Sequence, residues 1–380
     1  MAKKVVLVGT AHPFRGGLAS YNERLIKEFV NQGEEASIET FTLQYPNFLF
    51  PGKTQYSDSP KPTDIEIIES VNSINPFNWI KIGRKIKKQK PDYLIFKFWL
   101  PFMAPCFGTI ARIVRKNKKT KVISIIDNII PHEKRIGDKM LSKYFVKSMD
   151  GFVAMSKSVL DDLNTFDSKK PKLYNPHPLF DNFGELLDRE TALKNLDLNP
   201  EYRYILFFGF VRDYKGLDLL LEAFAEERFR GEKIKLIVAG EYYNNEQKYL
   251  DLIQKLKLEE HIVLKNEFIA NEEVKDYFCA ADIIAQPYKN ATQSGVTQIG
   301  YHFEKPMLVT NVGGLAELIP HNKVGFVVEP NKEEIANSLL SFFEENRKEE
   351  MVENVKKEKE KFSWKKMIDT INQLDDLIIK

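Results

Sequence analysis

Short apolar segments alternate with amphipathic helical segments along the whole chain, and this alternation constrains the fold more than any other feature. The segment "KVVLVG" (residues 4–9) is rich in β-branched residues and ends in glycine, which is typical of a buried parallel strand. The next segment, "LASYNERLIKEFVNQG", places apolar residues on one face of a helix that ends at Gly33. The alternation therefore predicts a doubly wound α/β fold with right-handed crossovers. In the first half, further strands are predicted at residues 36–43, 92–99, 121–127 and 151–156, and further helices at residues 77–91 and 109–119.

The length and one proline-rich stretch divide the chain in two. A chain of 380 residues is longer than a typical single domain. The stretch "KKPKLYNPHPLFDNFG" holds three prolines and is typical of a connection between domains, and the alternation of strands and helices restarts after it. We therefore expect two doubly wound, Rossmann-like domains that face each other across a cleft, residues 1–173 and 174–361, followed by a terminal helical segment at about residues 362–380.

Composition excludes several classes of function. The 56 basic and 54 acidic residues nearly cancel, so we expect no nucleic acid partner. Cys106 and Cys279 lie among apolar neighbours and are predicted to be buried thiols in a reducing compartment. No apolar stretch reaches the length of a membrane span, and the first strand begins too early for a signal peptide, so a cytoplasmic location is expected. The chain has no H-E-x-x-H, C-x-x-C or Walker A pattern, and no metal site is predicted.

Loops after predicted strands carry the candidate binding residues, because ligands of open α/β sheets bind outside the carboxyl ends of strands. Gly16 and Gly17 precede a helix, so their N–H groups could approach an anionic or sugar ligand, although a plain tight turn fits equally well. Arg212 and Lys215 stand between a strand and a helix. Such a cation pair suits a diphosphate, and the alternative is a solvated loop.

Two more loops have the same position. Asp127 ends a strand, and His132 and Glu133 follow a proline shortly after it; they could orient a hydroxyl or polarise a phosphate, or belong to a plain surface loop. The stretch "PYKNATQSGVTQIGYHFEKPMLVT" (residues 287–310) passes from a polar turn into an apolar helix. Backbone N–H groups around Ser294, Gly295 and Val296 are placed there to meet a diphosphate or a ribose. Ser294 lacks the G-x-S-x-G setting of a hydrolase nucleophile. Downstream, "NVGGLAEL" puts a glycine pair before another predicted helix that includes Glu317.

These motifs together resemble a known family. The segments "FGFVRDYKGLDLLLEAF", "LIVAGE", "YFCAADIIAQPYKNATQSGVTQIGYHFEKPMLVTNVGGLAELI" and "GFVVEP" resemble the C-terminal half of family 4 retaining glycosyltransferases of the GT-B fold. The segments "HPFRGGLASYNERL", "LQYPNFLFPGKTQ" and "DNIIPHE" resemble the acceptor-side domain of a bacterial branch of that family with a Gln-Ser-Gly-Val donor loop. "FSWKKMIDTI" resembles the terminal helix that crosses back to the first domain in this fold.

The resemblance implies a retaining glycosyltransferase of the EC 2.4 class. Such an enzyme moves a sugar from a nucleotide-diphosphate sugar to an acceptor hydroxyl on a glycan or a lipid-linked molecule, as in cell-surface polysaccharide or glycolipid assembly, and requires no metal or other cofactor. Arg212 and Lys215 would neutralise the departing diphosphate. The residues carried over from the resemblance are Arg212, Lys215, Asp127 and His132 as catalytic; Gly16, Gly17, Gly209, Gly240, Gln293, Ser294, Gly295, Val296 and Gln298 as donor-binding; and His12, Arg15 and Glu133 on the acceptor side.

The chain departs from the family pattern at two places. Family members carry two glutamates in the donor loop, and the corresponding positions hold Ala291 and Ile299 here, so hydroxyl recognition is expected to move to neighbours such as Gln298. Asp127 replaces the usual strand-end histidine of the acceptor domain. The missing glutamates motivate an alternative function, a catalytically silent nucleotide-sugar-binding partner protein. A sugar-nucleotide epimerase has less support, because no carboxylate pair suited to acid/base chemistry is evident.

Two basic helices raise the question of a membrane partner. Cations from Lys81 to Lys90 lie on one predicted helix and cations from Arg112 to Lys121 on or beside another, with aromatic residues nearby. These faces could dock peripherally on the anionic inner surface of the cell membrane. Two ordinary solvated helix faces explain the pattern equally well.

Overall fold

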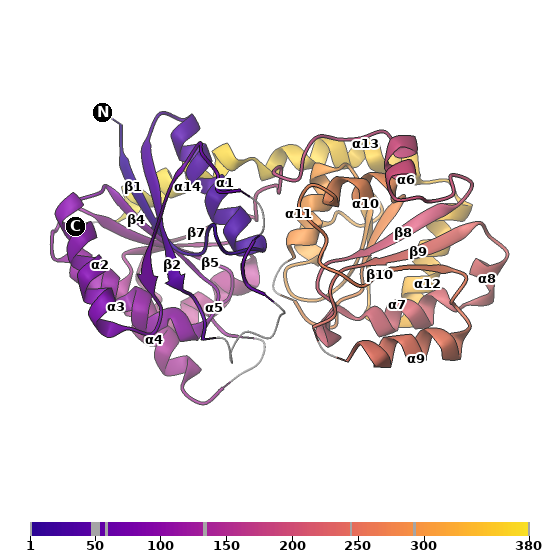
Figure 1. Cartoon of the computed structure of the whole chain (residues 1–380), viewed down its shortest axis with the longest axis horizontal. Helices are drawn as coiled ribbons and strands as arrows, with labels where there is room; N and C mark the ends of the chain where they lie inside the picture. Colours follow the sequence, from indigo (N-terminus) through magenta and orange to yellow (C-terminus); the bar gives the residue numbers. More distant parts are fainter. Residues whose placement is uncertain are drawn as a thin grey trace. The chain divides into compact units, whose positions relative to one another are not determined.

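The chain folds into two compact units, and each contains one parallel sheet (Figure 1). The first unit comprises residues 1–178 and 363–380, and the second comprises residues 179–362. This computed structural model describes residues 2–46, 54–57, 60–131, 135–243, 245–291 and 294–378. The fold class is α/β with two Rossmann-like domains, as the alternating pattern predicted.

The first unit has a seven-stranded sheet of order β3-β2-β1-β4-β5-β6-β7, in which all strand pairs are parallel. Its strands are β1 (Lys4–Val8), β2 (Glu35–Leu43), β3 (Glu66–Asn72), β4 (Tyr93–Phe98), β5 (Lys121–Ile126), β6 (Gly151–Ala154) and β7 (Lys172–Tyr174). Its helices are α1 (Gly17–Asn31), α2 (Pro76–Gln89), α3 (Ala104–Arg115), α4 (Asp138–Ser148), α5 (Lys157–Phe166) and α14 (Trp364–Leu377). Helix α3 packs against both α2 and α4, whereas α1 packs against α14, so helices cover both faces of the sheet.

The second unit has a six-stranded parallel sheet of order β10-β9-β8-β11-β12-β13. Its strands are β8 (Arg203–Phe208), β9 (Ile234–Ala239), β10 (Ile262–Lys265), β11 (Ile283–Gln286), β12 (Met307–Thr310) and β13 (Gly325–Val328). Its helices are α6 (Arg189–Asn195), α7 (Leu217–Phe224), α8 (Glu227–Arg230), α9 (Glu246–Leu256), α10 (Val274–Ala280), α11 (Gly295–His302), α12 (Lys332–Glu344) and α13 (Lys348–Glu358).

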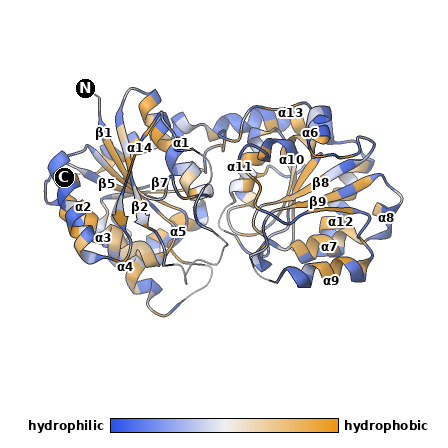
Figure 2. Ribbon diagram, viewed as in Figure 1, coloured by the Kyte–Doolittle hydropathy of each residue, from blue (hydrophilic) through white to orange (hydrophobic). Residues whose placement is uncertain are grey.

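Each unit has its own apolar core. Figure 2 shows hydrophobic residues concentrated in the strands of both sheets and hydrophilic residues on the outer helix faces. In the first unit, Phe107 of α3 lies against Phe96 of β4, with ring centroids 5.1 Å apart. In the second unit, the rings of Phe224 and Phe229 pack together with centroids 5.1 Å apart. Both predicted buried thiols, Cys106 and Cys279, are buried and free.

Three local features differ from the sequence prediction. Strand β3 was not predicted, because "EIIESVN" alternates weakly. Strand β7 lies inside the proline-rich connection, so the predicted boundary at residue 173 falls within a strand, and the division lies at 178/179. Three residues between prolines carry too little periodicity to indicate a strand. The helix predicted after the glycine pair at 313–314 is a single 3₁₀ turn, Ala316–Leu318.

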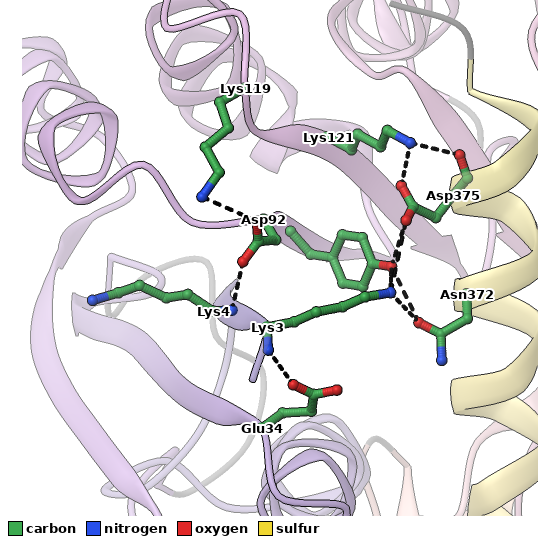
Figure 3. A network of polar contacts seen from close by, with 9 residues as sticks. Lys3, Lys4, Glu34, Asp92, Lys119, Lys121, Asn372 and Asp375 are labelled. Carbon is green, nitrogen blue, oxygen red and sulfur yellow. Dashed lines mark hydrogen bonds and ion pairs between the residues drawn. The ribbon is translucent and has the colours of Figure 1, made fainter. Parts of the chain in front are cut away.

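A polar network fastens α14 to the amino-terminal edge of the first sheet (Figure 3). The Tyr93 hydroxyl donates to Oδ2 of Asp375 at 2.9 Å. The ammonium of Lys121 donates to the Asp375 backbone carbonyl at 2.7 Å and also pairs with its carboxylate. The ammonium of Lys3 donates to Oδ1 of Asn372 at 2.8 Å. The C-terminal helix is therefore part of the first unit, held by side chains from β4, β5 and the start of β1.

We expect Asp375→Ala to lower the free energy of unfolding of the first unit by about 1–3 kcal/mol, because it leaves Tyr93 and Lys121 without their shared acceptor. Urea unfolding measures this change. Asp369 on the same helix is the matched control: its pair with Lys365 is more than half exposed on both sides, so Asp369→Ala should change stability by less than about 0.5 kcal/mol. Equal losses for the two variants would contradict the structural role of the network.

Candidate functional site

The strand order places a candidate site in each unit. In the first unit β1 lies beside β4, and in the second β8 lies beside β11, so the chain reverses its direction of sheet growth at these points. Open parallel sheets bind ligands outside the carboxyl ends of the strands at such a switch point. The loops that follow β1, β4, β8 and β11 therefore form the candidate sites.

In the second unit, predicted donor residues from three segments converge. Gly209 follows β8 with φ at 92°, and a Cβ there would lie 3.1 Å from Nζ of Lys215 and 3.9 Å from Cγ2 of Val296. Gly240, after β9, packs on the same glycine, since a Cβ at Gly240 would lie 2.3 Å from the carbonyl oxygen of Gly209. Only glycine fits at position 240, because any side chain would collide with this backbone. The carboxyl ends of β8 and β9 therefore present bare backbone beside the ammonium of Lys215.

Lys215 is a buried cation without an anionic partner in the part of the chain that the structure describes. Its exposed fraction is 9%, and its ammonium makes neither a hydrogen bond nor an ion pair with any described residue. The Tyr288 ring lies 5.7 Å from Nζ, measured to the ring centroid. Burial, and then repulsion from Arg212, lowers the pKa of Lys215 to about 7. A buried charge without compensation is costly, so this position favours a bound anion.

Arg212 is oriented by stacking and not by a carboxylate. Its guanidinium carbon lies 3.8 Å from the centroid of the Tyr243 ring. The Tyr243 ring lies edge-on to the Phe210 ring with centroids 5.4 Å apart, and the Phe210 and Phe268 rings pack together with centroids 6.3 Å apart. No described residue forms an ion pair with Arg212. Its N–H donors are therefore unneutralised, which suits bidentate binding of a phosphate.

The loop after β11 is anchored by Ser294. Its hydroxyl oxygen caps α11 by accepting the N–H of Val296 at 3.2 Å, and it lies 3.1 Å from the Tyr288 hydroxyl. The sequence suggested that the Val296 N–H would meet a ligand, but the serine cap already occupies it. Gly295 packs against Phe180, since a Cβ at Gly295 would lie 2.8 Å from that ring. This loop is therefore internally braced, with Val296 directed toward Gly209.

Two buried glutamines beside this loop have unsatisfied amides. Gln298 is fully buried, and neither its Oε1 nor its Nε2 has a hydrogen-bond partner in the described residues. Gln286 ends β11; its Oε1 accepts from Thr297 at 3.1 Å, whereas its Nε2 has no partner among the same residues. Ala291 and Ile299, which the resemblance places at the glutamate positions, are both buried. Buried unsatisfied amides are rare in native proteins, so both glutamines are candidate site residues. Gln286 was not predicted, although a polar residue ending the apolar segment "DIIAQ" is the signal for it.

In the first unit, the loop after β1 leads to the N-terminus of α1. Gly16 is its N-cap residue with φ at 101°, and a Cβ there would meet no described atom within 4 Å. The His12 N–H donates to the Glu23 carboxylate at 2.6 Å, and burial raises the pKa of Glu23. Arg15 donates from Nε to the carbonyl of Thr54 at 3.0 Å, so this predicted acceptor-side residue also braces a neighbouring loop. The N-terminus of α1 is open on the side of Gly16.

Asp127 belongs to a buried polar cluster that the sequence did not predict. It follows β5, and its Oδ1 accepts from the ammonium of Lys97 in β4 at 2.8 Å. The Tyr21 ring lies 3.4 Å from that nitrogen, and the His177 ring meets Tyr21 edge-on at 5.0 Å. Burial lowers the pKa of Lys97, against the opposing effect of Asp127. Burial, and then Lys97, lowers the pKa of His177 to about 3, so this imidazole is neutral.

Three predicted site residues cannot be placed. His132, Glu133 and Gln293 lie outside the described residues. Gly17 begins α1 next to Gly16 and is exposed. Within the described ranges, no group of three or more His, Cys, Asp or Glu side chains is arranged to hold a metal ion.

Comparison with known proteins shows what the second unit is similar to. Residues 188–362 match the family model described as Glycosyl transferases group 1. The match spans nearly all of the second unit and no part of the first. An uncharacterized glycosyltransferase of Methanocaldococcus jannaschii is 23% identical over 377 residues, which are 96% of this chain and 95% of that protein.

Solved structures with the same fold are glycosyltransferases of the GT-B type. Sucrose-phosphate synthase from Thermosynechococcus elongatus superposes with a TM-score of 0.74 at 14% identity, covering 98% of each chain. Anabaena HepE, solved in complex with UDP-glucose, superposes with a TM-score of 0.72 at 14% identity, covering 97% of this chain and 98% of HepE. The region that matches the family model contains Arg212, Lys215 and the helix α11 that follows the loop after β11.

We expect Lys215→Met to raise the free energy of unfolding of the ligand-free second unit by about 1–4 kcal/mol at pH 7, because an apolar side chain removes the buried unpaired charge. The depressed pKa also fixes a pH dependence. In the unfolded chain Lys215 has the ordinary lysine pKa of about 10.5, whereas in the folded unit its pKa is about 7. Between pH 7 and 10.5 the unfolded chain therefore binds more protons than the folded unit, so Lys215 makes the free energy of unfolding of the wild type rise with pH in this range. Below pH 7 both states are protonated, and Lys215 adds no pH dependence.

Urea unfolding across this pH range measures both effects, and Lys215→Met should lack the slope. The matched control is Lys289→Met on the loop after β11, since Lys289 is exposed and paired with Asp218 at 2.6 Å. We expect that control to change stability by less than about 1 kcal/mol. A Lys215→Met protein less stable than wild type would show that the lysine has a structural partner.

Proposed function

We propose that the protein transfers a sugar from a nucleotide-diphosphate sugar to an acceptor hydroxyl with retention of the anomeric configuration. The observation that carries this proposal is the pair Arg212 and Lys215, two cations at the switch point of the region that matches the family model, without described anionic partners. HepE, which shares the fold, was solved with UDP-glucose and so supports this donor class. A nucleotide diphosphate supplies the negative charge that both side chains lack.

The cation pair also accounts for the chemistry at the donor. When the bond between the sugar and the diphosphate breaks, negative charge accumulates on the departing oxygens. Lys215 and Arg212 are already oriented, one by burial and the other by stacking, so they stabilise this charge without reorganising. They supply the positive charge that a divalent ion supplies in other transferases, and we propose that no metal is required.

The first unit is proposed to bind the acceptor, a glycan or a lipid-linked molecule. Its candidate contacts are at the carboxyl edge of the sheet, where the open N-terminus of α1 and Asp127 provide polar groups for hydroxyls. A role in cell-surface polysaccharide or glycolipid assembly follows from such an acceptor.

Turnover of a panel of nucleotide sugars tests the function. We expect one donor to raise the melting temperature and to be transferred or slowly hydrolysed. Arg212→Ala and Lys215→Ala should each lower kcat by about 10²–10³-fold, because each removes a stabilising charge from the leaving group. Lys235→Ala is the matched control: its ammonium also lies over a ring, 4.7 Å from the centroid of Tyr202, but near the other end of β9. Full activity of Arg212→Ala and Lys215→Ala would refute the diphosphate site.

The buried apolar side chains of Ala291 and Ile299 favour one alternative, a catalytically silent nucleotide-sugar-binding partner protein. The same panel separates the two functions. Donor binding with neither transfer nor hydrolysis, under any acceptor tested, would support the silent protein.

We further propose a cytoplasmic protein that docks peripherally on the anionic inner face of the membrane through α2. None of the described helices is long and apolar enough to cross a bilayer. Helix α2 exposes Phe77 at 84% and Ile80 at 36%, and these line a surface hollow with Lys81, Arg84 and Lys88. Apolar side chains beside a group of cations suit the headgroup region of an anionic bilayer.

Flotation with phosphatidylserine vesicles measures this docking. We expect Lys81→Glu/Arg84→Glu to weaken binding at least about tenfold, because each cation near the surface contributes about 1 kcal/mol. Lys356→Glu/Lys357→Glu on α13 makes the same change in net charge away from exposed apolar residues and should bind normally. If the wild-type protein does not bind anionic vesicles at low salt, the proposal is wrong.

A further inference from the structure

Lys97 is a charged residue in a position where the fold favours an apolar one. Strand β4 reads "YLIFKF", all six of its residues are buried, and it lies at the centre of the sheet between β1 and β5. The exposed fraction of Lys97 is 2%. A lysine inside a central parallel strand contradicts the local pattern, and such contradictions occur mainly at functional sites.

The ion pair with Asp127 does not by itself explain the lysine. Removing two charges from water costs about as much as their attraction returns, so a packed apolar pair is often at least as stable as a buried ion pair. The charges are also at a particular place. Lys97 is the last residue but one of β4, and Asp127 follows β5 directly, so the pair lies at the carboxyl edge of the sheet beside the switch point.

The groups around the ammonium fix it in place, and Asp127 is the carboxylate that pairs with it. The ring centroid of Tyr21, in α1, lies 3.4 Å from Nζ of Lys97, and Sδ of Met155 lies 4.0 Å from the same nitrogen. His177, which packs on Tyr21, is neutral because burial lowers its pKa to about 3. The titratable groups that face Lys97 from the surrounding elements are therefore an unionised tyrosine, an uncharged imidazole and one carboxylate.

We propose that Lys97 is a positioning residue that holds Asp127 as an ionised hydrogen-bond acceptor for a sugar hydroxyl at the edge of the first sheet. This inference rests on the proposed function. A carboxylate paired with a lysine accepts hydrogen bonds and donates none, so the ligand must donate, which a hydroxyl does and a phosphate or carboxylate does not. Lys97 does not touch the ligand; it acts through Asp127.

The turnover of substituted proteins distinguishes positioning from packing. Lys97→Met removes the cation that holds Asp127, so at neutral pH we expect kcat to fall at least about tenfold. Lys97→Arg keeps the positive charge and should recover part of this loss. A lysine that only filled space would give the opposite order, because methionine packs into a buried position more easily than arginine.

The double variant Lys97→Met/Asp127→Asn gives the second readout. It has no unpaired buried charge, so it can be measured even if Lys97→Met alone fails to fold. Positioning predicts that it matches Asp127→Asn within about threefold, because a residue that acts through Asp127 has no effect once Asp127 is gone. Asp150→Asn is the control: it breaks an ion pair with Arg115, 2.9 Å long, at the start of β6 on the opposite edge of the sheet. It should leave turnover within about threefold of wild type.

The outcomes separate this inference from the proposed function. A wild-type protein that neither transfers nor hydrolyses any nucleotide sugar would overturn the function, and the role of Lys97 with it. An active wild type whose Lys97→Met variant keeps the wild-type turnover, or whose two substitutions have multiplicative effects, would overturn the role of Lys97 alone. If donor hydrolysis without acceptor also falls, the hydroxyl belongs to the transferred sugar; if only transfer falls, it belongs to the acceptor.

Discussion

The reversal of strand order at the centre of each parallel sheet is the constraint on which both candidate sites depend. Because all strands run the same way, their carboxyl ends and the loops that follow them share one edge. The connections after the two central strands lead toward opposite sides of the sheet. The loops suited to ligand binding therefore lie beside β1 and β4 in one unit and beside β8 and β11 in the other. Three buried charged residues, Lys97, Asp127 and Lys215, lie near these two points.

The two units differ in whether their buried charges have a partner of opposite charge. In the second, Lys215 and Arg212 lie together without described anionic partners, so the site has a positive charge that a bound anion would neutralise. In the first, Lys97 is neutralised by Asp127, and the pair can offer a hydrogen-bond acceptor. Burial strengthens both effects, because water does not screen the charges. Diphosphate and hydroxyl groups are the two chemistries that nucleotide sugars combine, which is why this substrate class suits the protein.

Local patterns predicted the parts of the site that are contiguous in the chain. Arg212 and Lys215 stand in one loop between a strand and a helix, so their position at a strand end could be inferred from order alone. The α/β alternation predicted the fold class for the same reason. The unsatisfied amides of Gln286 and Gln298 could not be inferred, because hydrogen-bond satisfaction depends on neighbours from different segments. Strand β7 was missed because three residues show no usable periodicity.

The sequence by itself determined the fold class, the division into two units and the loop that carries the cation pair, since each depends on periodicity or on neighbours along the chain. Tertiary structure alone decided which charges are compensated. Lys97 and Asp127 are 30 residues apart and meet only because β4 and β5 are adjacent. Lys215 acquires its depressed pKa only because folding buries it next to Arg212. Electrostatic energies depend on distance and burial, and neither quantity exists until the strands are assembled.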